Sequence, residues 1–416
     1  IAPVSPKQST EYTFPDGGWQ AWRNVFGCFL LAVTSFGQLN AFGVFQTYYA
    51  ANMLPNYSNS AISWIGSIQL TITYASGIVL GRIFDVYGAR KTLVLGCILS
   101  TFCLMMTSIS HKYYQLILSQ GIGLGIGIAL QFWLYSHSVQ MIVPSHWFRM
   151  RRATATGIVL SGASLSGIIY PIMLSRLFSS VGFPWAVRAM AFMNFGLQAL
   201  AIPMVKERLP HNAGNILIDY HAFKDITYLL HVISGFIISF GLYAPFWYLS
   251  LFSLSVGINF NLSFYMIAIM NAAGLIGRLS SGYLADWFGR FNITIPCIVL
   301  SAIAPLAIWT TSEGLAETIV FSVIFGFSSA AYSSIAASVT AQITADPTRI
   351  GMRIGMFILC CSEQFANCQV QSSAILASRH GDYIGLQIFI GIVMIAGAVF
   401  ETVARLHRVP RIWCKF

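Results

Sequence analysis

Two ionisable residues lie inside long apolar stretches of the sequence, where a charge is costly. Arg278 stands in MNAAGLIGRLSSG, and Glu363 stands in LCCSEQFANCQVQSS. A charge inside a membrane is expensive unless it faces a cavity or finds a partner. The guanidinium could bind an anion, and the carboxyl could titrate, accept a hydrogen bond from a substrate or pair with Arg278. The alternatives are that Arg278 snorkels to the water at the end of its helix, and that Glu363 lies near the membrane surface.

Catalytic and metal-binding patterns are missing from the sequence. The glycine-rich string GIGLGIG follows no predicted strand and lies inside an apolar run, which favours close helix packing over nucleotide binding. His137 and His231 are isolated, and the eight cysteines show no zinc or disulfide spacing. We therefore predict that the protein is not an enzyme and needs no cofactor or metal.

The composition requires lipid as the main solvent. The chain has 416 residues, of which 56% are hydrophobic and only 9% are charged. A soluble domain carries roughly 25% charged residues, so a water-exposed surface of this size could not be built. The net charge of +10 comes from residues between apolar runs, which argues against a nucleic-acid partner.

Apolar runs long enough to span a bilayer as helices occur twelve times. The fold class is therefore all-α membrane protein, with twelve transmembrane helices in two six-helix bundles. The predicted spans are 24–49, 62–80, 92–110, 114–139, 153–175, 185–205, 227–252, 262–281, 292–310, 316–342, 352–377 and 384–404.

Basic residues alternate between the two sides of this pattern. One side holds only Lys112, Arg176, Arg188 and Arg379, while the other holds nearly all the rest and both ends of the sequence. By the positive-inside rule, both termini are cytoplasmic. The predicted organisation is a cytoplasmic segment 1–22, a bundle 23–205, a polar linker 206–225, a second bundle 226–404 and a cytoplasmic tail 405–416. Because the chain starts at Ile1 rather than methionine, we also expect a native N-terminal segment to be missing.

A short motif appears twice, once in each half. Gly81-x-x-x-Asp85-x-x-Gly88 returns as Gly282-x-x-x-Asp286-x-x-Gly289, each time after the second span of its half, and Arg90 and Arg290 follow. Glycines permit a tight turn and close helix approach. The aspartates could pair with basic residues or cap a helix, and such pairs could break and re-form as the halves move. A plain positively charged turn is the alternative. An internal repeat is typical of secondary transporters.

Three strings resemble a known family. GRIFDVYGARK resembles the loop motif of the major facilitator superfamily. PDGGWQAW, with Asp16, Gly17, Gly18, Trp19 and Trp22, resembles the first signature of monocarboxylate transporters. WFRMRRATATGIVLSG resembles their second signature through Phe148, Arg149, Arg151, Arg152, Ala155, Gly157 and Gly162. NAFGVFQTYY and the segment 271–290 look more like the fungal branch than the animal one.

The resemblance implies a role for Arg278. In that family, an arginine in the eighth span binds the substrate carboxylate, and an aspartate one turn earlier helps to couple protons. This sequence keeps the arginine but has Gly274 in place of the aspartate, and no lysine occurs between Lys7 and Lys91. Proton coupling by that pair is therefore in doubt. Tyr243, Asn271, Tyr332 and Glu363 are further candidates for substrate binding, as polar residues of the later spans.

The sequence therefore predicts a secondary transporter of a small organic molecule, a monocarboxylate or related anion, working by alternating access in a lipid bilayer with protons as a candidate partner. Export of a secondary metabolite is one alternative, and a transporter-like sensor without turnover is another. The expected location is the plasma membrane, with a vacuolar or other organelle membrane as the alternative. Two outward loops carry glycosylation sequons at Asn56 and Asn261.

Overall fold

The computed structural model describes residues 15–76, 89–136, 147–148, 150–206, 220–346, 349–379 and 381–408. These residues form helices and their connections, with no strand among them. The helices join end to end into twelve rods within the described part of the chain, and each rod occupies one predicted span. Eight of these rods are long and apolar enough to cross a membrane, and Ala61–Thr73 and Met352–Cys361 are shorter apolar helices.

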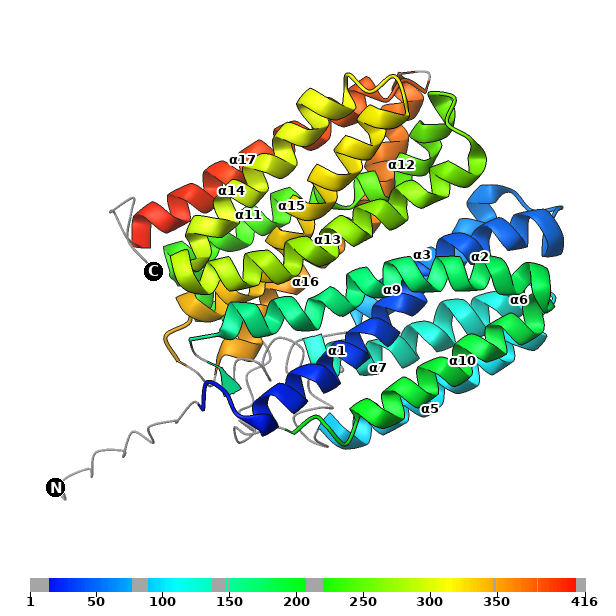
Figure 1. Cartoon of the computed structure of the whole chain (residues 1–416), viewed down its shortest axis with the longest axis horizontal. Coiled ribbons are helices and arrows are strands. Elements are labelled where there is room, and N and C mark those ends of the chain that lie inside the picture. The colour runs from blue at the N-terminus through cyan, green and yellow to red at the C-terminus, as the bar shows by residue number, and fades with distance from the viewer. Residues whose placement is uncertain are drawn as a thin grey trace.

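The first six rods form one bundle and the last six form another (Figure 1). The first bundle consists of α1 (Trp19–Asn40), α2 (Phe42–Tyr48), η1 (Tyr49–Met53), α3 (Asn59–Ala75), α5 (Ala89–Ile109), α6 (Tyr113–Leu116), η2 (Ile117–Gly123), α7 (Leu124–Ser136), α9 (Arg152–Ser180) and α10 (Gly182–Ala201). The second consists of η3 (Tyr220–Lys224), α11 (Ile226–Leu242), α12 (Ala244–Ser255), α13 (Phe260–Phe288), α14 (Arg290–Ile303), η4 (Ala304–Trp309), α15 (Leu315–Ile343), α16 (Ile350–Ser378) and α17 (Ile384–Arg408).

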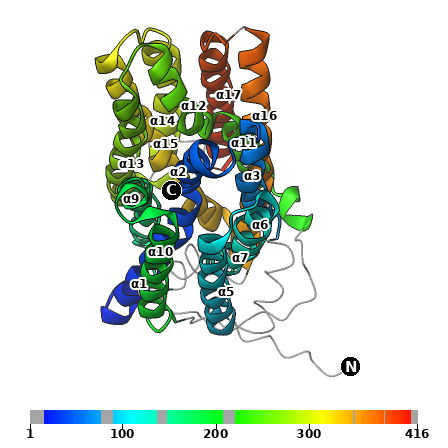
Figure 2. The ribbon, with the colours of Figure 1, turned by 90° about the vertical axis from the view of Figure 1, so that its right-hand side faces the viewer.

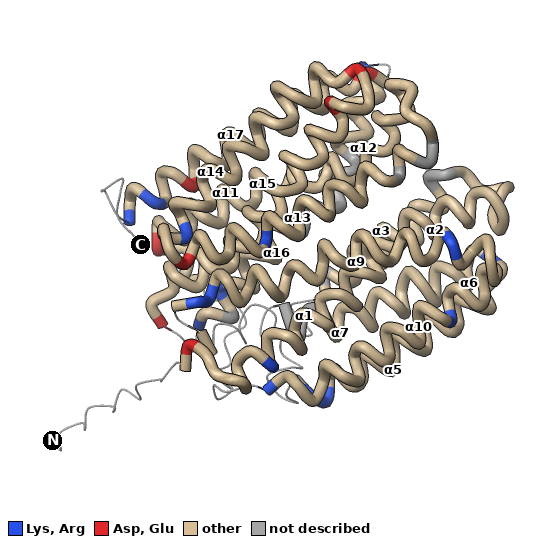
Figure 3. Tube along the Cα trace, in the orientation of Figure 1, with Lys and Arg blue, Asp and Glu red and all other residues tan. Residues whose placement is uncertain are grey.

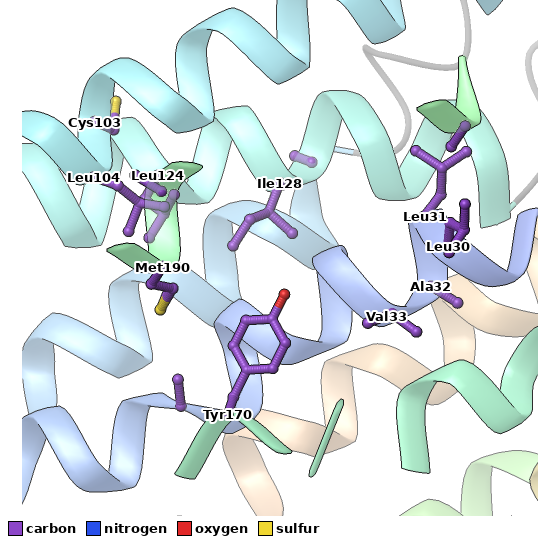
Figure 4. Close-up of a cluster of buried hydrophobic side chains, with 14 of the residues drawn as sticks. Leu30, Leu31, Ala32, Val33, Cys103, Leu104, Leu124, Ile128, Tyr170 and Met190 are labelled. Atoms are coloured by element: carbon purple, nitrogen blue, oxygen red, sulfur yellow. The ribbon is translucent and has the colours of Figure 1, made fainter. Parts of the chain in front are cut away.

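Each bundle has its own apolar core. One cluster of buried side chains comes from residues 21–205, and a second comes from residues 222–404 with Ala153. In the first core, Tyr170 of α9 points in among aliphatic side chains of neighbouring helices, such as Ile128 and Met190 (Figure 4). Its hydroxyl donates a hydrogen bond to the side chain of Asn194.

The two bundles meet along three helix pairs, α9 with α13, α9 with α15 and α3 with α16. The end-on view shows one bundle above the other, with α9 and α13 side by side (Figure 2). The contact between the bundles therefore consists of helices from opposite halves of the sequence packed against each other.

The outward faces of the helices are apolar, and polar residues lie on their inward faces. On α17, Ile392 and Val399 are more than half exposed (57% and 56%), whereas Gln387 and Glu401 are buried. Water would favour the opposite arrangement, so this pattern indicates a lipid surroundings for the outer face. The structure thus has the distribution expected of a multi-pass membrane protein.

Lysine and arginine gather at the end of the molecule where α1 begins and α17 ends (Figure 3). We call this the basic end. The described residues at the opposite end carry Lys112, Arg176, Arg188 and Arg379. Side-chain caps fix the starts of two helices: Ser58 accepts a hydrogen bond from the amide of Ala61 at 3.2 Å before α3, and Asp225 accepts one from the amide of Thr227 at 3.1 Å before α11.

Candidate functional site

Arg278 lies in the contact between the two bundles. It extends from α13, and its Nη1 donates a hydrogen bond of 3.0 Å to the carbonyl of Leu160 in α9. Its Nε is buried and has no hydrogen-bond partner among the described residues. A guanidinium has five N–H donors, so this arginine keeps donors for a further acceptor. The side chain binds across the interface, which argues against simple snorkelling.

Two predicted substrate-binding tyrosines follow Arg278 into the second bundle. Tyr243 lies at the break between α11 and α12, within electrostatic range of Arg278. Tyr332 of α15 is buried, within electrostatic range of Tyr243 and Glu401. Tyr243 is thus within electrostatic range of both Arg278 and Tyr332. Asn271 lies earlier than Arg278 on the same helix, α13. Its side chain packs against Gly167 of α9 and donates a hydrogen bond to the carbonyl of Ile267 at 3.0 Å.

Glu363 lies in the middle of α16, but its side chain is outside the described residues, so its predicted role stays a prediction. Two pockets formed by described residues lie away from Arg278. One of about 480 Å³ is lined by apolar side chains of α11, α16 and α17 together with Gln371. The other, of about 300 Å³, lies beside Trp309, Asp382 and Gln387 at the end opposite the basic end.

The second copy of the repeated motif forms a cap between the bundles at the basic end. The carboxylate of Asp286, at the end of α13, accepts hydrogen bonds from the amides of Ala153 and Thr154 at 3.1 and 2.8 Å. It also accepts one from the Thr154 hydroxyl at 2.8 Å. These donors open α9, so an aspartate of one bundle caps a helix of the other. A negative charge at a helix N-terminus is favourable because the terminal amides are unpaired and the helix dipole is positive there.

Arg290 holds this aspartate from its own bundle. The guanidinium Nη2 lies 3.7 Å from Asp286 Oδ1, and Nη1 donates to the carbonyl of Ser338 in α15 at 3.3 Å. Gly289 has a φ of 98° and lets the chain turn from α13 into α14. The predicted pairing of the motif aspartate with a basic residue is therefore present in this copy, together with the helix cap that was its alternative.

Two glycines allow α9 and α13 to approach at this point. A Cβ on Gly157 would lie 2.4 Å from the carbonyl oxygen of Arg278, and a Cβ on Gly282 would lie 2.6 Å from that of Ala153. Both distances are too short for real atoms, so the helices can cross this closely only with glycine. Gly157 belongs to the family signature and Gly282 to the repeated motif. The two motifs are thus the two sides of one contact.

The first copy of the motif cannot be placed, because Gly81, Asp85 and Gly88 lie outside the described residues. Arg90 is exposed in the first turn of α5. The predicted role of Asp85 in a breakable pair therefore stays a prediction.

The two signature strings contact each other at the basic end. Asp16 adopts a φ of 50°, its amide donates to the carbonyl of Trp147 at 3.0 Å, and its carboxylate accepts from the amide of Met150 at 2.7 Å. The rings of Trp22 and Phe148 pack with centroids 5.0 Å apart. The first signature thereby fixes the turn that leads into α9, the helix that Asp286 caps.

The remaining signature residues surround this turn. Gly17 and Gly18 precede α1, Trp19 is largely exposed at its first position, and Arg151 is exposed beside α9. Arg152 is buried and its Nε donates to the carbonyl of Phe148 at 3.3 Å, whereas Arg149 lies outside the described residues. Of the two sequons, Asn56 is exposed in the turn before α3, and Asn261 lies in the first turn of α13 with its side chain outside the described residues.

Sequence reasoning missed an acidic residue that is fully buried in a span, Glu401. Glu401 of α17 lies against His231 of α11. A carboxyl inside the apolar run 384–404 was the signal that could have found it.

The chain folds into two six-helix bundles joined across α9 and α13, and it belongs to the major facilitator superfamily. The family model "Major Facilitator Superfamily" matches residues 25–362. The protein is a membrane transporter and not an enzyme, as the sequence predicted.

Similar proteins are named as transporters, efflux proteins or symporters. The chain is 39% identical over 406 residues to "MFS-type transporter 1" of Ophiocordyceps sp., covering 97% of this chain and 89% of that protein. It is 36% identical over 400 residues to the "Fujikurins efflux protein" of Gibberella fujikuroi, covering 94% and 84%. The fold also resembles the crystal structure of the E. coli fucose:proton symporter FucP, with a TM-score of 0.68 at 10% identity, covering 91% of this chain and 98% of that one.

Proposed function

We propose that this transporter exports an acidic product of fungal secondary metabolism, with Arg278 as the contact for its negative group. The observation that carries the proposal is the buried Nε of Arg278, which has no partner among the described residues although Nη1 is bound to Leu160. A carboxylate is the natural partner, because two N–H groups of a guanidinium bind both its oxygens.

Export is the direction favoured by similarity. The relative from Gibberella fujikuroi is named an efflux protein for fujikurins, and this supports the export of a comparable compound here. Export would place the protein in the plasma membrane, with the basic end in the cytoplasm. In this orientation the Asp286 cap closes the cytoplasmic side, and transport requires that it open.

Uptake of a short monocarboxylate is the second candidate. The observation that favours it is the contact between the two signature strings through Asp16 and Met150, which are the strings that resemble monocarboxylate transporters. The two candidates share an anion bound at Arg278 and differ in the size of the substrate and in direction.

Flux measured in proteoliposomes separates these candidates. Vesicles with the purified chain are loaded with fujikurins in one set and with radiolabelled lactate in another, and release is compared with protein-free vesicles. We expect release of fujikurins that is abolished in Arg278→Ala. Release of lactate alone would favour the second candidate, and binding without release of either would leave only a sensor.

A further inference from the structure

Three polar side chains from three helices meet inside the second bundle. Nδ1 of His231 in α11 lies 3.0 Å from both carboxyl oxygens of Glu401 in α17. Nε2 of the same ring lies 3.1 Å from the hydroxyl of Thr340 in α15. The side chains of His231 and Glu401 are both 0% exposed. All three helices belong to the second bundle.

The hydrogen bonds determine how many protons the group holds. The hydroxyl of Thr340 donates to the carbonyl of Ala336 at 3.1 Å, so its oxygen faces His231 as an acceptor. Nε2 therefore carries a proton. A second proton must lie between Nδ1 and Glu401, because two bare acceptors would repel each other at this distance. With both protons the group has no net charge, which suits its burial.

The second proton is the one that can leave. When it departs, the remaining proton moves to Nδ1, so the neutral ring donates to the Glu401 carboxylate and Nε2 accepts from the Thr340 hydroxyl. Among the described residues, the hydrogen bonds of that carboxylate go to His231. The ring cannot move aside easily, because Phe357 stacks on it with centroids 4.6 Å apart and planes 7° apart. Releasing the proton thus leaves one buried negative charge.

Polar groups lead from this site in both directions. Toward the basic end, the hydroxyl of Thr227 lies 3.1 Å from Nδ1 of His407. Thr227 is one turn before His231 on α11, and His407 follows Glu401 on α17. Tyr332 is within electrostatic range of Glu401 and of Tyr243, and Tyr243 is within that range of Arg278. Tyr332 of α15 and Cys361 of α16 are ionisable groups within electrostatic range of Glu401. The site's own helices also carry Tyr228 of α11 and Arg405 and His407 of α17.

We propose that His231, Glu401 and Thr340 form a buried proton-binding site that couples proton movement to transport. One proton enters between Nδ1 and Glu401 and leaves by way of His407 to the water at the basic end. The resulting charge acts on Arg278 by way of Tyr332 and Tyr243. Proton binding stands by itself, whereas the coupling rests on the proposed function.

Infrared difference spectra of the reconstituted chain at stepped pH test proton binding. A buried protonated carboxyl absorbs apart from carboxyls in water. We expect a pH-dependent band of this kind that is absent in Glu401→Gln and unchanged in the control Glu317→Gln, since Glu317 is an exposed acid. A band that persists in Glu401→Gln would overturn the site.

Thr340→Val keeps the test decisive if Glu401→Gln does not fold. The variant removes the acceptor for Nε2 and leaves the carboxyl in place. Thr340 accepts from Nε2 and donates to Ala336 only while the second proton is bound, so its loss should weaken proton binding about tenfold. Proton binding as tight as in the wild type would show that Thr340 is not part of the site.

Fujikurin transport with and without a pH gradient tests the coupling. Glu401→Gln should lose gradient-driven accumulation and keep exchange at equal pH, while Glu317→Gln behaves as wild type. Normal accumulation in Glu401→Gln, or its loss in Glu363→Gln alone, would overturn the coupling and favour a carboxyl in α16. If the wild type carries no compound, the proposed function fails, and the infrared result still decides the proton site.

Discussion

Replacing Asp286 with asparagine should open the basic end of the transporter. The carboxylate accepts three hydrogen bonds of 2.8 to 3.1 Å from the first residues of α9 and is almost fully buried. Asparagine has the same shape but turns an N–H₂ group toward donors and removes the charge. A hydrogen bond to a charged group contributes about 1.5 to 3 kcal/mol, and a charge at a helix N-terminus contributes about 0.3 to 1 kcal/mol.

We therefore expect Asp286→Asn to lose about 2 to 3 kcal/mol of the free energy that favours the closed form. At about 1.4 kcal/mol for each factor of ten, this is a shift of roughly 30- to 150-fold in the ratio of closed to open molecules. The full shift applies because the contact joins the two bundles and is lost when they part.

Distances between spin labels measure this ratio directly. Labels at Lys206 of the first bundle and Arg408 of the second report separation at the basic end, and both positions are exposed. The matched control is Asp346→Asn, because Asp346 pairs with Arg349 on the surface at 3.4 Å with both side chains about half exposed. The share of molecules with the longer distance between labels should increase in Asp286→Asn and stay unchanged in Asp346→Asn. Equal distance distributions in the two variants would refute the gating role and return the motif to a plain turn.

Three further predictions follow from the interface and the loops. Arg278→Ala should abolish transport of anions while the protein still reaches the membrane, and Arg278→Lys should restore little because the bidentate fork is lost; normal flux in the alanine variant would mean a neutral substrate. Gly157→Ala should lower the melting temperature through a destabilisation of about 1 to 3 kcal/mol, since its Cβ meets the Arg278 carbonyl, and Gly196→Ala, which has open space, serves as its control. An epitope inserted after Pro55 should bind antibody on intact cells, and labelling only after permeabilisation would reverse the predicted sidedness.

The order and number of the helices could be read from the sequence because each span is an uninterrupted apolar run. The breaks inside the spans could not. The turn at Tyr243 between α11 and α12, and the π-helical segments η1, η2 and η4, lie within runs that look uniform. Hydropathy reports the length of a span and is insensitive to a local change in helix geometry.

The site was predicted only where one residue carried the signal. Arg278 was recognisable because a charge in an apolar run is rare, and the structure places it between the bundles. His231, Thr340 and Glu401 are far apart in the sequence, and their meeting depends on how three helices are rotated about their axes. The contact between the two signature strings depends on the backbone of Asp16, whose φ of 50° no residue pattern announces.

The cap at α9 has an osmotic consequence. While it is closed, the carboxylate of Asp286 and the donors of Ala153 and Thr154 bind one another directly. When the bundles part, each of these groups must be hydrated, so opening takes up water. Solutes that are excluded from protein surfaces, such as sucrose, lower the activity of that water and favour the form that exposes less surface. The resting state of this transporter should therefore depend on the hydration of the cytoplasm as well as on its substrate.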